Sequence, residues 1–357
     1  MAVSKPSKGW YPDPQNDTRM RLWDGLHWTE HTKGAERSTL TVCDRKAPKF
    51  MIVPALCLAP TLLFVAYLFA SYPIVVILSS LGLLFTIPAY IWFDKLEPEP
   101  LAHRWNAFVW GAGVCILVSG IVNSLASAVA GLEFSAVVSA PLVEETLKVL
   151  GVLVLARKKA VGSPLDGFVY AGYVGLGFAS IENLLYYYES LETLGFSGLA
   201  STFVVRGVLA PFAHPYFTIW AGLFVGKACR DSKSLFAASL KGLAIGIPLH
   251  AIWNASALSG SIGLVGTVAL VNLVLFVIVT SRMVKARKIE ITKVRNNIRS
   301  LAFTFNISPV ELEMYGDLKL VKKFRKSLPK TNRRQFDYRY ATIVNHLLAI
   351  EKPANMQ

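Results

Sequence analysis

The sequence predicts an all-α polytopic membrane protein with about eight transmembrane helices and small cytoplasmic regions at both ends. Hydrophobic residues make up 53% of the 357 residues and charged residues only 17%, with a mean hydropathy of +0.44. These values lie outside the range of an ordinary soluble domain. The apolar residues also gather into separate runs of about 20 residues, the length that crosses the ~30 Å hydrocarbon core of a bilayer. Four cysteines without CxxC spacing indicate neither a disulfide framework nor a zinc knuckle.

Residues 1–49 are predicted to form a cytoplasmic N-terminal region. They are mostly polar and contain a tryptophan-rich module at about residues 9–32. Its three tryptophans and the Asp24-Gly25 turn favour a compact, hairpin-like β unit. A module of about 25 residues can hardly bury a core of its own, so we expect it to pack against or bind another partner.

Residues 50–285 are predicted to form the transmembrane core. We expect eight spanning helices, at roughly 50–71, 74–93, 105–130, 138–156, 168–188, 203–226, 235–257 and 262–284. Alternate loops carry Lys and Arg, whereas the opposite loops carry Glu133, Glu189 and Glu192 and no basic residue. By the positive-inside rule, both termini are therefore expected on the cytoplasmic side.

Residues 286–357 are predicted to form a basic, helical cytoplasmic tail. From Arg282 to the last residue there are 17 Lys and Arg and 6 Asp and Glu, so this stretch carries 17 − 6 = 11 of the net +14. Such a segment after an apolar helix is typical of a region that faces anionic lipid headgroups. No nucleic-acid reader motif accompanies it, so we expect no nucleic-acid partner.

Two helices are expected in this tail. Ser308 to Glu311 has the pattern of a helix start. Further on, apolar residues recur at helical spacing on one face: Phe336, Tyr340, Ile343, Val344, Leu347 and Leu348. We interpret this tail as a docking or membrane-surface region without chemistry of its own.

Four of the predicted helices carry ionisable or amide side chains at membrane depth. The candidate site residues are Glu144, Glu145, Lys148, Glu182, Asn183, Tyr186, His214, His250 and Asn254. A charge at the centre of a bilayer costs roughly 2.5–3.5 kcal/mol on insertion scales, and such residues usually mark a functional site. The predicted topology puts the groups at similar depth in the outer half of the membrane. We therefore expect them to share one cavity that opens outward.

The paired glutamates suit acid–base chemistry. Lys148 is one helical turn from Glu144 and three residues from Glu145, so it could neutralise either carboxylate. The alternative is an ion pair that merely joins helices. That alternative leaves the second glutamate without a partner, whereas an unpaired carboxylate in a low dielectric suits a general acid or base.

The histidines add metal-binding or polarising groups. His250 and Asn254 share a helix face, where a histidine can bind a metal and an asparagine amide can donate to an oxyanion. A core histidine satisfied by a neighbouring helix is the alternative. His214 lies between Pro211 and Pro215, where the helix cannot complete its hydrogen bonds, which is tolerated where backbone lines a cavity.

Two further side chains near Glu182 have expected positions. Tyr186, one turn after Glu182, is placed to donate a hydrogen bond to it. Arg206, near the outer end of the sixth predicted helix, is expected to extend to the membrane interface rather than to join the site.

In this order, the motifs resemble the PrsW family of intramembrane proteases, within a larger group that contains CAAX prenyl endopeptidases and bacteriocin-related proteins. The matching segments are Glu144-Glu145-x-x-Lys148, Phe178-x-x-x-Glu182 with Asn183 and Tyr186, His214, and His250-x-x-x-Asn254, with Glu97–Pro100 and Phe108–Gly111 upstream. The resemblance covers about Leu83 to Lys285. Residues Gly9–Pro14 and Arg21–Thr29 are similar to a short tryptophan-rich module of actinobacterial membrane proteins.

The resemblance implies an intramembrane endopeptidase in a bacterial cell membrane. Its substrates would be membrane-tethered proteins similar to anti-sigma factors, cut near the extracytoplasmic side. In the expected mechanism, Glu144 or Glu145 is the general base on a water held with Glu182 and His214. His250 and Asn254 either complete a metal site or stabilise the oxyanion.

The cofactor stays open at this point. Zinc could be held by His214, His250 and Glu145, as in catalytic sites with three protein ligands and a water. A metal-free glutamate protease is the alternative, because Lys148 already places positive charge near the carboxylates.

Two other classes of function fit the same residues less well. A proton-coupled transporter could use the Glu and His side chains as a relay, but helices 1–4 and 5–8 show no internal repeat. An inactive membrane scaffold would need no complete motif set.

Overall fold

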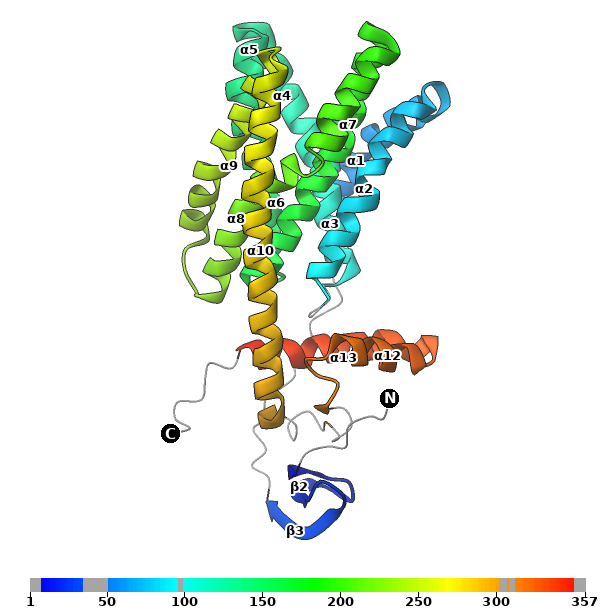
Figure 1. The fold of residues 1–357 in the computed structure, drawn as a ribbon, viewed down its shortest axis with the longest axis vertical. Coiled ribbons are helices and arrows are strands. Elements are labelled where there is room, and N and C mark those ends of the chain that lie inside the picture. The colour runs from blue at the N-terminus through cyan, green and yellow to red at the C-terminus, as the bar shows by residue number, and fades with distance from the viewer. Residues whose placement is uncertain (1–7, 35–50, 96–98, 302–306, 308–311, 350–357) are drawn as a thin grey trace. The chain divides into compact units, whose positions relative to one another are not determined.

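The computed structural model describes residues 8–34, 51–95, 99–301, 307 and 312–349 (Figure 1). The chain divides into two compact units. The first, which we call the helical unit, contains the described residues from 51 to 283, apart from Lys95. The second, the terminal unit, combines the N-terminal module with the chain after Met283. Each unit is described separately.

The helical unit confirms the predicted all-α class of polytopic membrane protein. Its elements, in chain order, are α1 Ile52–Ser71, α2 Pro73–Phe93, α3 Leu101–Val109, the π-helical turn η1 Trp110–Cys115, α4 Ile116–Ala130, α5 Leu132–Phe134, the π-helical turn η2 Ser135–Ser139, α6 Ala140–Arg157, α7 Pro164–Phe203, the π-helical turn η3 Val204–Leu209, α8 Ala213–Arg230, α9 Leu235–Leu258 and α10 Ile262–Leu301. The residues of α10 after Met283 belong to the terminal unit.

The long helix α7 starts at a strong sequence signal and then turns back on itself. The hydroxyl of Ser163 accepts from the amide of Asp166, and the Asp166 carboxylate accepts from the amide of Ser163, which makes a capping box ahead of Pro164. At Gly195 the backbone has φ 68° and ψ −159°, a conformation that suits glycine. The Ser190 and Thr202 hydroxyls, 2.7 Å apart, bring the two legs of α7 side by side.

The predicted number of eight spans is not confirmed. Among the described residues, six segments are long and apolar enough to cross a membrane: 52–71, 73–93, 101–130, 164–230, 235–258 and 262–298. The predicted fifth and sixth helices fall within the single segment 164–230, which includes the turn at Gly195. The predicted fourth helix corresponds to α6, whose 18 residues contain Glu144, Glu145, Lys148 and Arg157. With four charged residues, α6 is not apolar enough to be counted among these six segments.

Glycines let the central helices approach to backbone contact. A β-carbon built on Gly167 in α7 or on Gly222 in α8 would overlap the carbonyl group of the other glycine. One built on Gly177 would overlap the carbonyl of Phe108 in α3. Side-chain-free contacts of this kind are typical of membrane helix interfaces. They fix α7 between its neighbours and so position the polar residues that follow Gly177.

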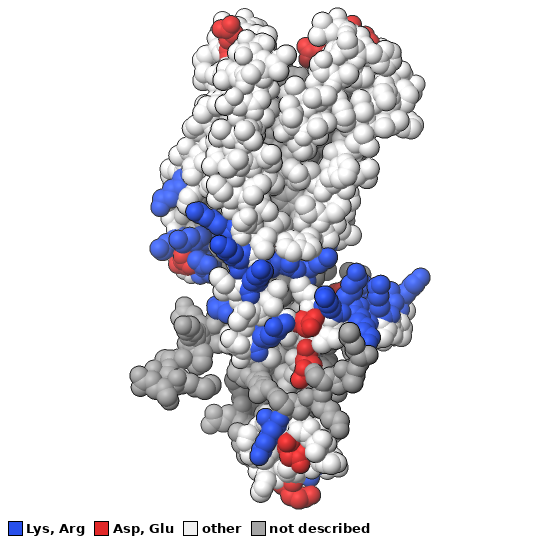
Figure 2. All heavy atoms as spheres, viewed as in Figure 1, with Lys and Arg blue, Asp and Glu red and all other residues white. Residues whose placement is uncertain are grey.

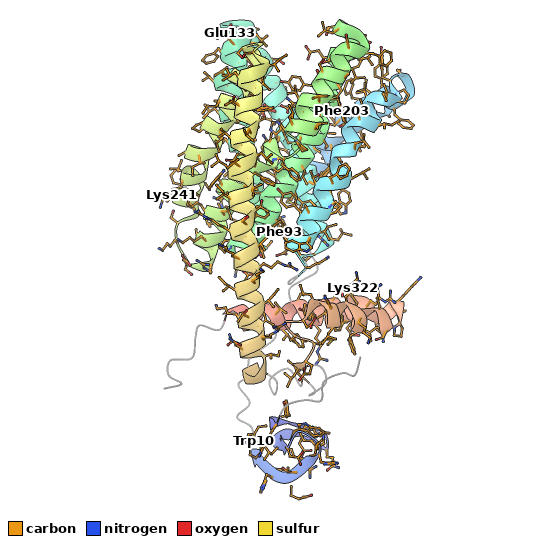
Figure 3. The ribbon with its side chains drawn as sticks, viewed as in Figure 1. Trp10, Phe93, Glu133, Phe203, Lys241 and Lys322 are labelled. Carbon is orange, nitrogen blue, oxygen red and sulfur yellow. The ribbon has the colours of Figure 1, made fainter. Side chains whose placement is uncertain are left out.

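Acidic side chains are seen at one end of the helical unit, and basic side chains gather toward the other end (Figure 2). Glu133 marks one end and Phe93 lies near the other (Figure 3). Lys158, Lys227 and Arg230 are exposed, and the basic side chains gather toward the Phe93 end (Figure 2). This distribution agrees with the asymmetry of Lys and Arg in the sequence.

A buried polar group, which we call the loop cluster, lies where α2, α3 and α7 meet. An oxygen of Asp94 lies 3.1 Å from Arg104 Nη1, and the other accepts from the amide of Glu99 at 3.1 Å. The Tyr170 hydroxyl donates to the Glu99 carboxylate at 2.5 Å. Asp166, at the start of α7, completes the cluster and accepts from backbone amides of residues 162 and 163. Burial raises the pKa of Asp94 to about 7, although Arg104 opposes that rise.

The terminal unit contains the tryptophan-rich module, which is a three-stranded antiparallel sheet. Strands β1 Gly9–Asp13, β2 Asn16–Trp23 and β3 Trp28–Gly34 pair in chain order. The predicted hairpin is present, with one strand more than a single hairpin has. Tyr11, Trp23 and Trp28 share one apolar cluster with residues after Met283, including Val294 and Ile343. Such a small sheet thus gains a core from the rest of its unit.

The tail helices are α12 Leu318–Ser327 and α13 Lys330–Ala349. The predicted apolar face of α13 is buried at Tyr340, Ile343, Val344 and Leu347. The predicted helix start at 308–311, Glu97–Pro98, Cys43 and the side chain of Leu348 lie outside the described residues.

Candidate active site

The candidate site is a buried cluster of polar side chains from α6, α7, η3, α8 and α9. It contains Glu144, Glu145 and Lys148 from α6, Glu182 and Asn183 from α7, Arg206 from η3, His214 and Thr218 from α8, and His250 from α9. Lys148 is fully buried, and Glu145 and His250 are each 1% exposed. Seven predicted residues from four helices therefore meet in one place, as the sequence analysis expected.

Lys148 occupies the centre of this cluster. Its Nζ lies 2.8 Å from Glu145 Oε1, 3.4 Å from Glu144 Oε2 and 3.0 Å from His214 Nδ1. The ring of Phe178 covers it, with 3.9 Å from Nζ to the ring centroid. An ammonium group has three protons and no acceptor, so these three neighbours use its full hydrogen-bonding capacity.

The three glutamates have different surroundings. Glu145 contacts Lys148, His250 Nδ1 at 3.1 Å and the hydroxyl of Thr218 at 2.9 Å. Glu144 has longer contacts: 3.2 Å to Asn123 Nδ2, 3.4 Å to Lys148 and 3.9 Å to His250 Nε2. Glu145 is thus held firmly on both oxygens, and Glu144 less so.

Glu182 belongs to a second group of contacts around Arg206. The Glu182 carboxylate pairs with the Arg206 guanidinium and lies 2.6 Å from His214 Nε2. Arg206 Nε also donates to Asn183 Oδ1 at 2.8 Å, and the guanidinium lies 4.0 Å from the Tyr186 ring centroid. The expectation that Arg206 points to the membrane interface is wrong. Tyr186 supports the guanidinium with its ring.

Asn254 has a structural contact at the edge of the cluster. Its amide donates to the carbonyl of Ala136 in η2 at 2.8 Å, which joins α9 to the turn that precedes α6. The same turn binds Asn123, because Ser139 donates to the Asn123 side chain at 3.0 Å. The structure therefore places the Asn254 amide on the backbone of η2.

Three side chains were missed in the sequence analysis: Arg206, Asn123 and Thr218. Arg206 could have been found from the sequence. It is a basic residue in the otherwise apolar stretch 203–209, and the three predicted glutamates had only Lys148 to neutralise them. The sequence contains no comparable signal for Asn123 and Thr218, since amide and hydroxyl side chains are common in membrane helices. The Thr218 hydroxyl also lies 3.0 Å from the carbonyl of His214 in its own helix, a contact that any helical threonine can make.

Comparison with known families decides the affiliation. Residues 99–281, just over half of the chain, match the family described as PrsW family intramembrane metalloprotease. The chain belongs to the PrsW family. The matched segment contains every candidate site residue. Residues 9–39 match a second family, described as a protein of unknown function (DUF2510).

Curated PrsW relatives are similar over the same core. The chain is 30% identical over 140 residues to Protease PrsW of Clostridioides difficile (strain 630), which covers 38% of this chain and 57% of the relative. It is 33% identical over 138 residues to Protease PrsW of Geobacillus kaustophilus (strain HTA426), covering 38% and 58%. The chain thus spans less than two thirds of the length of these relatives. No solved structure matches the chain.

The family description implies a metal, and the donor types alone suit one. Ligand atoms of Glu144, His214 and His250 lie within 4.8 Å of one another, and two histidines with a glutamate occur in catalytic zinc sites. The sequence analysis named the same histidines with Glu145 instead of Glu144.

The arrangement of these donors does not fit a metal. Nδ1 of His214 faces the Lys148 ammonium and Nε2 faces Glu182, so neither ring nitrogen offers a free lone pair. A divalent ion bound to Glu144 and His214 would also lie beside the Lys148 ammonium, which contacts both residues and would repel it. We therefore derive no catalytic step from a metal ion.

Proposed function

We propose that the protein is an intramembrane endopeptidase that hydrolyses peptide bonds of membrane-tethered proteins with a glutamate-activated water. The observation that carries this proposal is the gathering of three carboxylates, two histidines and two cations, all buried or partly buried, in one cluster of a membrane-spanning fold. Intramembrane burial of so many ionisable groups is costly and marks a site of function. Membership of the PrsW family supports hydrolysis over other chemistry.

Glu144 is the general base in this proposal. A base must accept a proton from water, so it needs a carboxylate oxygen that is not saturated by strong donors. Glu145 is bound by Lys148, Thr218 and His250, and Glu182 by Arg206 and His214. Glu144 has the weakest contacts of the three. Glu145 then positions Lys148 and His250 around it.

The substrate approaches from the side of Tyr186 and Arg206. Tyr186 is 43% exposed, and the side chains of Glu182 and Arg206 are each 13% exposed, whereas Lys148 is fully buried. A peptide carbonyl entering there meets Arg206 first, with Lys148 behind it. Arg206 is suited to donate to the carbonyl oxygen, and the positive charge of Lys148 behind it adds electrostatic stabilisation of the negative charge that develops there.

The proposal includes the cellular setting. Both termini lie in the cytoplasm of a bacterial cell, the Glu133 end of the helical unit faces outward, and the substrates resemble anti-sigma factors. Lys319, Lys322 and Lys326 of α12 are exposed, while Leu318 and Val321 of the same helix pack against the apolar cluster of the terminal unit. The positive charge of the three lysines suits an anionic lipid surface.

Comparison of membrane-protein fragments tests the proposal. Cells that produce the wild-type chain should yield new N-termini in single-span membrane proteins, and cells that produce Glu144→Gln should not. Glu133→Gln is the matched control, because Glu133 is exposed at the end of the helical unit. It should give the wild-type fragment pattern.

Two results would contradict the proposal. Identical fragment patterns from wild type and Glu144→Gln, with both proteins present at equal levels in the membrane, would leave an inactive scaffold. Proton flux into vesicles that depends on Glu144, without any cleavage, would favour the transporter.

A further inference from the structure

The surroundings of Lys148 are those of a bound cation. Its ammonium is fully buried and touches a carboxylate oxygen of Glu144, one of Glu145 and a ring nitrogen of His214. An ammonium only donates, so His214 must accept through the Nδ1 lone pair. That assignment leaves the proton of His214 on Nε2, where it is directed at Glu182, 2.6 Å away.

The same atoms would be needed by a metal. Two of the three candidate ligands, Glu144 and His214, are contacts of Lys148. Zinc bound at about 2.0–2.1 Å requires an imidazole lone pair and a carboxylate oxygen. In this chain the lone pair on Nδ1 is directed at the ammonium instead. Lysine and zinc are therefore competitors for the position.

The charge balance points the same way. Glu144, Glu145 and Glu182 contribute three negative charges, and Lys148 and Arg206 contribute two positive charges. A divalent ion added to this cluster would turn a net charge of −1 into +1. Buried clusters are stable when their charges are paired, and the two basic residues already provide that pairing.

We propose that the ammonium of Lys148 takes the place of a metal ion in this site, so that the chain works as a metal-free glutamate protease despite the description of its family. The protease activity in this inference rests on the proposed function, whereas the exclusion of a metal ion by Lys148 can be tested without any activity. Lys148 holds Glu144 and His214 in the positions that a metal would otherwise impose.

Metal binding by the full-length protein in detergent micelles tests this claim. Wild type, purified without chelator and equilibrated with zinc or with cobalt, should retain well below about one ion per chain after gel filtration. Lys148→Ala should open the position and retain about one ion, with a cobalt absorption band typical of nitrogen and oxygen ligands. Adding His250→Gln to Lys148→Ala should remove that binding, and Lys148→Arg should stay as empty as wild type.

Each outcome decides the inference. About one zinc per wild-type chain, lost in His214→Gln and His250→Gln, would overturn it. A Lys148→Ala protein as empty as wild type would show that the ammonium does not exclude the metal, and would also overturn it. Lys148→Gln replaces the alanine variant if that protein does not elute as a monodisperse peak. Absence of cleavage by a metal-free wild type would count against the proposed function alone.

Discussion

The candidate site and the loop cluster both bury acids and an arginine in the helical unit, yet their acids have different partners. In the loop cluster, backbone amides of residues 99, 162 and 163 donate to Asp94 and Asp166, beside the side chains of Arg104 and Ser163. In the site, the contacts described for Glu144, Glu145 and Glu182 come from side chains of Lys, Arg, His, Asn and Thr.

This difference separates a structural acid from a reactive one. A backbone amide is a fixed donor that cannot take up or release a proton, so it holds a carboxylate and ends a helix. A histidine or a lysine is a donor that can exchange protons with a substrate. Burial alone does not distinguish the two clusters, whereas the chemistry of the partners does.

The largest expected effect contrasts Glu144 with Asp94. Glu144→Gln should lower kcat/KM for a cleaved membrane substrate by about 10²–10⁴-fold, because it removes a general base. Asp94→Asn should change kcat/KM by less than about threefold. Initial rates in proteoliposomes measure both. Equal losses in the two variants would mean that the clusters do not differ in function.

The two arginines provide the next comparison. Arg206→Gln should reduce kcat/KM by about 10–100-fold, since it removes a charged donor from Glu182 and from the proposed carbonyl position. Arg206→Lys should recover part of this loss. Arg104→Gln should leave kcat/KM near the wild-type value and lower the thermal midpoint. A loss of activity in Arg104→Gln as large as in Arg206→Gln would refute the division.

The pH dependence of stability should report the loop cluster. Folding raises the pKa of Asp94 to about 7 from an ordinary value of about 3.9, so the folded state binds the proton more tightly than the unfolded state. The stabilising contribution of protonated Asp94 is therefore complete below about pH 4 and is lost as the pH rises to about 7. The slope is at most about 1.4 kcal/mol per pH unit.

Thermal unfolding in detergent between pH 4.5 and pH 8 measures this slope. The thermal midpoint of wild type should fall toward pH 8, and Asp94→Asn should flatten the curve. Ser135→Ala, which removes a buried hydroxyl far from the loop cluster in sequence, should keep the wild-type slope. An unchanged slope in Asp94→Asn would exclude Asp94 as its source.

The smallest effect compares two hydroxyl–carboxylate contacts of equal length. Thr218 donates to Glu145 and Ser163 donates to Asp166, each at 2.9 Å. Thr218→Val should lower kcat/KM by about 3–10-fold, in line with about 1 kcal/mol for one hydrogen bond. Ser163→Ala should destabilise the fold by about 1 kcal/mol through loss of the helix cap, with kcat/KM unchanged.

Much of the site could be predicted from sequence, because charge inside an apolar run is informative by itself. The carboxylates on α6 and α7 and the histidines on α8 and α9 do meet, as expected from their similar depth. Arg206 was misplaced since snorkelling is the common behaviour of a terminal arginine. Its actual direction depends on the turn at Gly195 and on η3, which pack this segment against α7.

Other features could not be derived because they depend on tertiary contacts. Whether Lys148 neutralises Glu144 or Glu145 follows from the position of His214 on another helix, 66 residues away in sequence. The number of spans depends on whether charge in α6 is shielded by neighbours, and sequence composition does not contain that information. The N-terminal module was predicted as a hairpin because only the Asp24-Gly25 turn was used, and a single turn connects only two of its three strands.

The three π-helical turns have an evolutionary consequence. A π turn holds one residue more than an α turn, so it behaves as a single-residue insertion inside an otherwise continuous helix. Each one adjoins the site: Trp110 of η1 donates to the carbonyl of Leu147, Ala136 of η2 accepts from Asn254, and η3 carries Arg206. A homologue that lost this extra residue in η3 would present the neighbour of the arginine to Glu182. An alignment of relatives should therefore allow a gap of one position between residues 204 and 209, so that the arginine that faces Glu182 is matched correctly.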